Sequence, residues 1–218
     1  MTRRVIISIV AVLIAFLIFS AVFFVWRNPI WGFGAFSGGL QSSITMDRAK
    51  QLAENYLISS GNDDLAIDEI IEFEYNFYIV YYEKSTGIGA FEGIIDKAGT
   101  GGMGMMYMMG SIYVRPEQGP NMMWNMKYGM HGIMGGWNGY SNSSVTVSQA
   151  KMYAQKYLDG AFSDAVVRDV HPFYGYYTIH VMRNDRVYGM LSVNGFTGQV
   201  WYHNWHGSYV QSLELRGS

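Results

Sequence analysis

Two histidines near the end of the chain, His203 and His206, form the only close histidine pair in the sequence. Imidazole nitrogen is a common ligand of zinc and copper, and an i, i+3 pair can converge on one ion at a helical turn or bend. No third ligand is near in sequence, so a tetrahedral site needs another side chain from elsewhere. The sequence offers Glu214, His171, His180 and His131 for this role. The alternative is a turn that caps a sheet edge with stacked aromatic rings.

A second set of potential ligands lies in residues 102–142, a stretch rich in methionine and glycine. Thioether sulfur prefers Cu(I) to harder ions and binds without losing a proton. Glycine gives the backbone the freedom to bring several sulfurs to one ion. One interpretation is therefore an extracytoplasmic Cu(I) site formed by this insert with His203 and His206. Its ligands in the insert would be Met103, Met105, Met106, Met108, Met109, Met122, Met123, Met126, Met130, His131 and Met134.

The same insert has two other interpretations. Methionine fills irregular gaps and forms adaptable contact surfaces, so the stretch can pack between domains or against a partner membrane protein. It can also lack a fixed structure. The sequence leaves all three interpretations open.

Several kinds of chemistry are excluded or disfavoured. The chain has no cysteine, which excludes disulfides and thiolate metal sites, and its net charge of −2 disfavours nucleic acid as a partner. We find no nucleophile–base order and no phosphate-binding loop, so we predict no enzymatic activity and no catalytic residue. A group of carboxylates straddles a turn and alternates along an expected strand, which predicts a solvated face. Its members are Asp63, Asp64, Asp68, Glu69, Glu72 and Glu74.

The two remaining histidines are assigned no ligand role of their own. His180 lies between Ile179 and Val181 on an expected strand, so it points away from the core that those neighbours face. We predict a surface or interface position for it. His171 precedes Pro172 and marks the end of a strand.

Residues 5–26, from Val5 to Trp26, contain no charged residue. As a helix they would extend about 33 Å, enough to cross a bilayer. Arg3 and Arg4 precede the segment and Arg27 follows it, which predicts a cytoplasmic N-terminus. A cleaved signal peptide is the alternative, but the apolar run is long and ends in bulky residues. We expect a single-pass cell-membrane protein, anchored in the lipid bilayer, with its main part extracytoplasmic.

An internal repeat organises the rest of the chain. Residues 44–57 align without gaps on residues 145–158, and Thr45 and Thr146 are the predicted N-caps of two amphipathic helices. Each helix is followed by sequence with β-strand character, which predicts an α+β fold with one helix on a short antiparallel sheet in each copy. The expected strands are residues 67–73, 76–83 and 88–96 in the first copy, and 165–171, 176–183, 186–193 and 198–202 in the second.

This order of elements resembles the PepSY domain family. The resemblance is carried by the opening of each helix and by residues 188–200. In this second segment an apolar strand is followed by Asn194, Thr197, Gly198 and Val200. The first copy keeps Asp96 but transposes the following Thr and Gly. The family implies binding or regulation and brings no catalytic residues. The predicted divisions are an anchor at 1–27, a linker at 28–43, PepSY-like modules at 44–101 and 143–218, and the insert at 102–142.

The predicted function is that of a membrane-anchored binding or accessory protein that contacts another membrane or envelope protein. The alternatives are an extracytoplasmic Cu(I)-binding protein and a peptidase inhibitor or folding helper, which some PepSY domains of propeptides resemble. Homo-oligomerisation remains open.

Overall fold

The computed structural model describes residues 44–97, 113–130 and 143–217, all within one compact unit, Ser43–Ser218. Within those ranges, no helix has both the length and the hydropathy that a bilayer crossing requires. The predicted anchor lies outside them. So do several predicted copper ligands, namely Met103, Met105, Met106, Met108, Met109, His131 and Met134.

The two long helices, α2 (Met46–Ser60) and α6 (Val147–Ala161), begin where the repeat predicts. The side-chain oxygen of Thr45 accepts a hydrogen bond from a backbone amide of the first turn of α2. Thr146 does the same for α6. The Gln149 side-chain oxygen in turn accepts a hydrogen bond from the Thr146 backbone amide, which completes a capping box. Both predicted N-caps are confirmed.

The strands form an α+β fold with a mixed nine-stranded sheet in the order β8-β7-β6-β5-β3-β2-β1-β9, with β4 paired to β3. Their bounds agree with the predicted strands to within two residues where a strand was predicted. The strands and one short helix are β1 (Leu65–Phe73), β2 (Asn76–Glu83), β3 (Gly89–Asp96), β4 (Arg115–Pro116), α4 (Pro120–Trp124), β5 (Val166–Phe173), β6 (Tyr176–Arg183), β7 (Arg186–Asn194), β8 (Val200–Tyr202) and β9 (Tyr209–Glu214).

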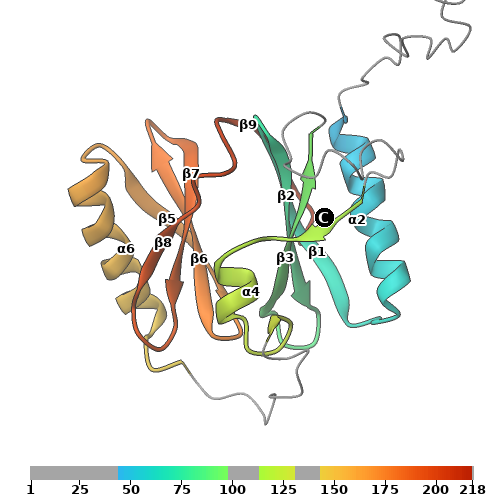
Figure 1. Cartoon of the computed structure of the whole chain (residues 1–218), viewed down its shortest axis with the longest axis horizontal. Coiled ribbons are helices and arrows are strands. Elements are labelled where there is room, and N and C mark those ends of the chain that lie inside the picture. The colour runs from blue at the N-terminus through green and yellow to red at the C-terminus, as the bar shows by residue number, and fades with distance from the viewer. Residues whose placement is uncertain (1–43, 98–112, 131–142, 218) are drawn as a thin grey trace, which may run out of the picture. The chain divides into compact units, whose positions relative to one another are not determined.

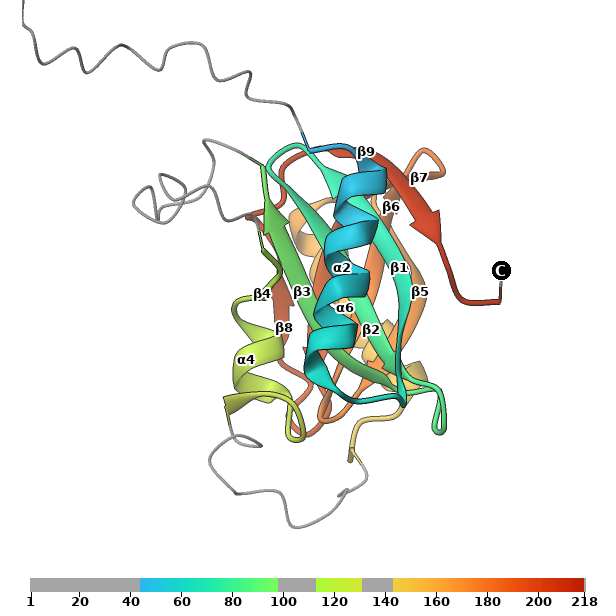
Figure 2. The same cartoon turned by 90° about the vertical axis from the view of Figure 1, so that its right-hand side faces the viewer.

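The sheet bends into two halves that face each other. We call α2 with β1–β3 the first half and α6 with β5–β8 the second half. Within the described residues, one parallel pair, Gly89 and Phe173, joins β3 to β5 along the sheet. The elements lie in four layers, with α2 and α6 on the outside and the strands of the two halves between them (Figures 1 and 2).

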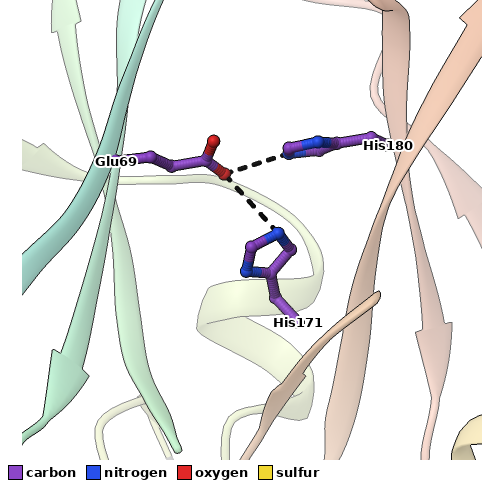
Figure 3. Close-up of side chains that lie close together, drawn as sticks. All are labelled: Glu69, His171 and His180. Atoms are coloured by element: carbon purple, nitrogen blue, oxygen red, sulfur yellow. Dashed lines mark hydrogen bonds and ion pairs between the residues drawn. The ribbon is translucent and has the colours of Figure 1, made fainter. Parts of the chain in front are cut away.

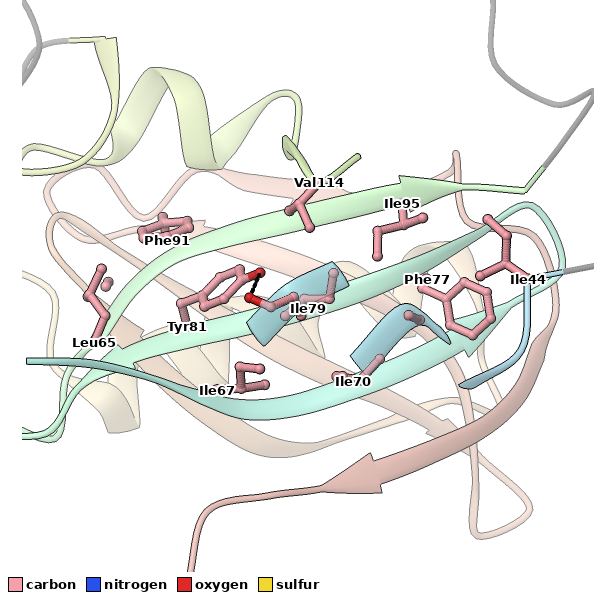
Figure 4. Close-up of a cluster of buried hydrophobic side chains, with 13 residues drawn as sticks. Ile44, Leu65, Ile67, Ile70, Phe77, Ile79, Tyr81, Phe91, Ile95 and Val114 are labelled. Atoms are coloured by element: carbon pink, nitrogen blue, oxygen red, sulfur yellow. Dashed lines mark hydrogen bonds between the residues drawn. The ribbon is translucent and has the colours of Figure 1, made fainter. Parts of the chain in front are cut away.

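Side chains alternate between the two faces of each strand, and they contribute to three separate hydrophobic cores. In β2, Phe77, Ile79 and Tyr81 pack under α2, and the Tyr81 hydroxyl donates a hydrogen bond to the Ala53 carbonyl oxygen at 3.4 Å (Figure 4). Tyr78 and its inward-facing neighbours pack against the second half instead. A third core lies under α6. Because both faces of each half-sheet are covered, the central strands are buried along nearly their whole length.

The end of the chain returns to the first half. β9 pairs antiparallel with β1 and extends the sheet beyond the predicted strands. β4 lies beside β3 as β8 lies beside β7, so each half has a short closing strand. The segment between β8 and β9 therefore passes from the second half to the first, and it carries His203 and His206 with it.

The close approach at Gly89 gives a test of how the halves pack. A Cβ at residue 89 would lie 2.6 Å from the Phe173 ring, so Gly89→Ala requires the halves to shift. We expect the free energy of unfolding to fall by about 1–3 kcal/mol, as for other overpacked sites. Gly160→Ala in α6 is the control, because a Cβ there meets nothing within 4 Å. It should leave stability unchanged or raise it by up to ~1 kcal/mol. Urea unfolding measures both, and equal effects would contradict the packing described.

Candidate metal centre between the sheets

The layer between the two half-sheets contains a buried polar cluster. Burying such groups costs free energy unless each has a hydrogen-bond or charge partner. Three ionisable side chains at its centre, Glu117, His203 and His206, are each at most 1% exposed. The other buried polar residues around them are Asn76, Glu92, Asn121, Asn125, Thr178 and Ser192.

Three potential ligand atoms converge in this cluster. The Glu117 Oε1 atom lies 3.0 Å from His206 Nε2 and 3.3 Å from His203 Nδ1. For metal–ligand bonds of about 2.0–2.1 Å, the edge of a coordination tetrahedron is roughly 3.4 Å. Both distances are close to this edge. The three residues thus form a group with the spacing of a metal site.

The hydrogen bonds of His206 determine which ring nitrogen carries the proton. The Asn76 side-chain amide donates to the Trp205 carbonyl oxygen at 3.1 Å, which orients the amide. Its Oδ1 is then an acceptor 2.8 Å from His206 Nδ1, so Nδ1 carries the proton. Burial lowers the pKa of His206, which favours the neutral ring. The Nε2 lone pair therefore faces the carboxylate of Glu117.

The same conclusion follows for His203 from a chain of hydroxyl groups. Thr178 donates its proton to Glu92 Oε1 at 2.5 Å, so its oxygen accepts from Ser192 at 3.1 Å. The Ser192 oxygen is then free to accept from His203 Nε2 at 2.9 Å. This places the ring proton on Nε2 and leaves the Nδ1 lone pair of His203 facing Glu117.

Two lone pairs and a carboxylate repel one another unless a positive charge lies between them. Within the described residues, His203 Nδ1 and His206 Nε2 are buried without any hydrogen-bond partner. Burial alone would raise the pKa of Glu117, but positive charge on the imidazoles beside it lowers that pKa below its usual range, so the carboxylate is ionised when such a charge is present. A proton on an imidazole or a metal ion can supply the missing charge. Burial disfavours the proton on His206.

Backbone and ring contacts hold the ligands in place. The Glu117 amide donates to the Glu92 carbonyl oxygen, and the His203 amide donates to Met190 on β7. Trp205 stacks on His203 with ring centroids 4.7 Å apart, and its indole N–H donates to Glu117 Oε1 at 3.2 Å. Phe73 on β1 stacks on the ring of His206 at 4.6 Å. Each ligand is thus oriented by a second set of contacts, as in established metal sites.

A neighbouring carboxyl group limits the charge in this layer. Glu92 accepts hydrogen bonds from the hydroxyls of Tyr78, Tyr176 and Thr178. Burial, together with the negative charge of Glu117, raises the pKa of Glu92 well above its usual range. Glu117 is therefore the carboxylate that carries negative charge at the centre.

Sequence reasoning found two of these three residues. His203 and His206 were predicted ligands, and the structure brings them together, although they are buried rather than at a sheet edge. The third residue is Glu117, which was not among the residues that the sequence offered as a third ligand. It belongs to the methionine-rich insert but is separated from the histidines by more than 80 residues. No local pattern in the sequence connects it to them.

The described methionines of the insert do not share this environment. Met122 and Met123 on α4, and Met130, have exposed side chains, and Met126 is half-buried. Among the described residues of the insert, Glu117 supplies the potential ligand atom that lies beside the histidines.

Two expectations about other polar residues were wrong, and a third was right in part. Asp68 and Glu69 are buried, not part of a solvated face, because the second half covers β1. His171 does not only mark a strand end, since it lies within β5 near both carboxylates. His180 was expected at a surface or an interface, and it lies at the interface between the halves, where Glu69 contacts its ring.

Glu83, at the end of β2, connects the insert and the second half to the first half. It is 2% exposed, forms an ion pair with Lys127, and accepts hydrogen bonds from Tyr128 and Tyr174. Burial alone would raise the pKa of Glu83. These partners overcome that effect and lower the pKa to about 2.

The low pKa of Glu83 predicts acid sensitivity. A carboxyl with a pKa of about 2 when folded and 4.5 when unfolded contributes stability above pH 5 and loses it as the pH falls towards 2. The difference corresponds to roughly 3 kcal/mol. Glu83→Gln should remove most of this contribution at pH 7 and flatten the pH dependence. Glu54→Gln, on the exposed face of α2, should change stability by less than about 0.5 kcal/mol. Equal pH profiles for Glu83→Gln and the unmutated chain would contradict the assignment.

Comparisons with known proteins add little. No family model matches the chain, and no curated protein matches it. One solved structure with detectable similarity is the C-terminal domain of YpeB from Bacillus megaterium, at 14% identity and a TM-score of 0.26. The alignment covers 73% of this chain and 62% of that one, so this chain spans less than two thirds of its length. At this TM-score, neither fold nor function can be transferred.

Proposed function

We propose that this chain is a membrane-anchored, extracytoplasmic binding or accessory protein that holds a divalent cation of the zinc class between its two half-sheets. The ligands are Glu117, His203 and His206. The proposal rests on one observation: three buried ligand atoms face one another at metal-site spacing, and within the described residues the two imidazole nitrogens among them have no hydrogen-bond partner. A buried group left in that state costs about 1–3 kcal/mol, and one ion removes both deficits.

The ligand types select the class of ion. Two imidazole nitrogens and one carboxylate oxygen suit Zn²⁺ and related divalent ions, whereas Cu(I) prefers the softer sulfur of methionine. Binding of Cu(I) by the insert is a separate proposal that depends on residues outside the described ranges. The two proposals share His203 and His206 but differ in Glu117 and in the methionines, so substitutions at those residues distinguish them.

The burial of the cluster favours a structural ion over a catalytic one. A catalytic zinc keeps a position open to substrate, whereas these three side chains are almost inaccessible to solvent. The ion would join Glu117, in the insert, to the segment between β8 and β9. It would thereby fix the position of α4, whose Met122 and Met123 are exposed. Exposed methionine is well suited to contact with a partner protein.

The proposed partner is another membrane or envelope protein. Two halves with one helix each on an antiparallel sheet agree with the proposed tandem PepSY-like modules, a family that implies binding or regulation. An accessory role needs no catalytic group, and the proposed ion would serve to hold the contact surface in one conformation.

Metal binding is tested on the full-length chain in detergent micelles after removal of metals with a chelator. Competition against a chromophoric chelator measures the Zn²⁺ equivalents bound. We expect His206→Gln to lose one equivalent, while Asn204→Ala, an exposed neighbour, retains it. Zn²⁺ at 100 times its Kd should stabilise the unmutated chain by about 2.7 kcal/mol. The proposal fails if His206→Gln binds as many equivalents as the unmutated chain. A parallel anaerobic Cu(I) titration reports on the insert.

Membrane anchoring is tested by cell fractionation. The full chain should stay with membranes after a carbonate wash and be released by detergent, because an apolar helix of 22 residues is held by the bilayer core. A chain that lacks residues 1–27 but keeps a cleavable secretion signal should appear in the soluble extracytoplasmic fraction. Recovery of the shortened chain with the membranes would contradict the proposed anchor.

A further inference from the structure

A second group of ligand atoms lies between the two halves and shares no residue with the first. Glu69 comes from β1 in the first half, and His171 and His180 come from β5 and β6 in the second half. Figure 3 shows the carboxylate pointing towards both imidazoles. Glu69 Oε1 lies 3.0 Å from His180 Nε2 and 3.8 Å from His171 Nε2.

The outer nitrogens of both rings face further carboxylates. His171 Nδ1 is 3.6 Å from Asp68 Oδ2, and His180 Nδ1 is 3.7 Å from Asp169 Oδ2. Metal-bound histidines commonly direct their second nitrogen to a carboxylate in this way, which orients the ring and makes the ligating nitrogen more basic. His171 Nε2, which faces Glu69, is buried without a hydrogen-bond partner among the described residues.

The local charge favours a cation. Glu214 on β9 is paired directly with Glu69 across the β1–β9 ladder. Together with Asp68 and Asp169, these residues place four carboxyl groups around two imidazoles. Arg216, which follows β9, lies 3.4 Å from Asp68 and offsets part of this charge. A site with such a charge balance attracts positive ions.

We infer that Glu69, His171 and His180 form a second site for a divalent cation of the zinc class, and that an ion there fastens the two halves together. The side chain of His171 is 22% exposed, so this ion can exchange with solvent, unlike one held by the fully buried first cluster. Its ligands come from both halves, which the described sheet joins through a single parallel pair. Occupancy of this site therefore adds to how firmly the halves hold together, and it follows the concentration of the ion in the surrounding solution.

The inference is independent of the proposed function, and one experiment separates them. Zn²⁺ equivalents are counted on the full-length chain and on two variants, His171→Gln and His206→Gln. We expect two equivalents for the unmutated chain and one for each variant. Arg168→Gln, an exposed substitution on β5, should keep both. If His171→Gln binds as many equivalents as the unmutated chain, the second site is overturned, whatever His206→Gln shows. Loss in His171→Gln alone supports the second site and contradicts the first.

A second measurement uses only the unmutated chain, so a folding defect in a variant cannot affect its result. In the metal-free chain, diethyl pyrocarbonate should modify His171, because its side chain is partly exposed. At Zn²⁺ ten times above Kd, the free-site population falls about tenfold, so the rate of modification should fall by a similar factor. Peptide mass spectrometry assigns the label to His171. Equal rates with and without Zn²⁺ would show that protonated imidazoles paired with the carboxylates account for the geometry, and the inference would be overturned.

Discussion

Carboxylates and imidazoles placed between two apolar sheets destabilise a fold unless each finds a partner or an ion. The middle layer of this protein is built around that constraint. Hydroxyl groups from β2 and β6 donate to Glu92, and a directed chain through Thr178 and Ser192 reaches His203. These bonds determine the protonated nitrogen of the ring. They thereby determine what the facing ligand atoms can bind.

The same constraint explains why segments that are distant in the sequence meet in the middle layer. Glu117 from the insert and the segment between β8 and β9 both enter the middle layer, although each leaves a different half. Backbone hydrogen bonds from Glu74 and Tyr75 to that segment hold it against the first half, and β9 then continues along β1. The halves are therefore joined mainly by side chains and by the returning end of the chain. Within the described residues, their contact along the sheet is a single pair.

The two histidine clusters differ in how they relate to solvent, and this difference separates their proposed roles. The first has a ring stacked on each imidazole and three side chains at most 1% exposed, so an ion would be held as part of the fold. The second has one partly exposed imidazole and a surplus of carboxylates, so an ion would exchange. Glu83, with its low pKa, adds a third connection between the halves that needs no ion but depends on pH.

Local sequence determined the helices, their threonine caps and most strands, because capping and hydrophobic periodicity act over a few residues. It also identified His203 and His206 by spacing. Tertiary structure alone decided that the halves face each other, which reversed the expected exposure of Glu69 and brought Glu117 to the histidines. A period-two pattern shows that a strand has two faces. It does not show that a second sheet covers the face away from the helix, because that contact joins residues far apart in the chain.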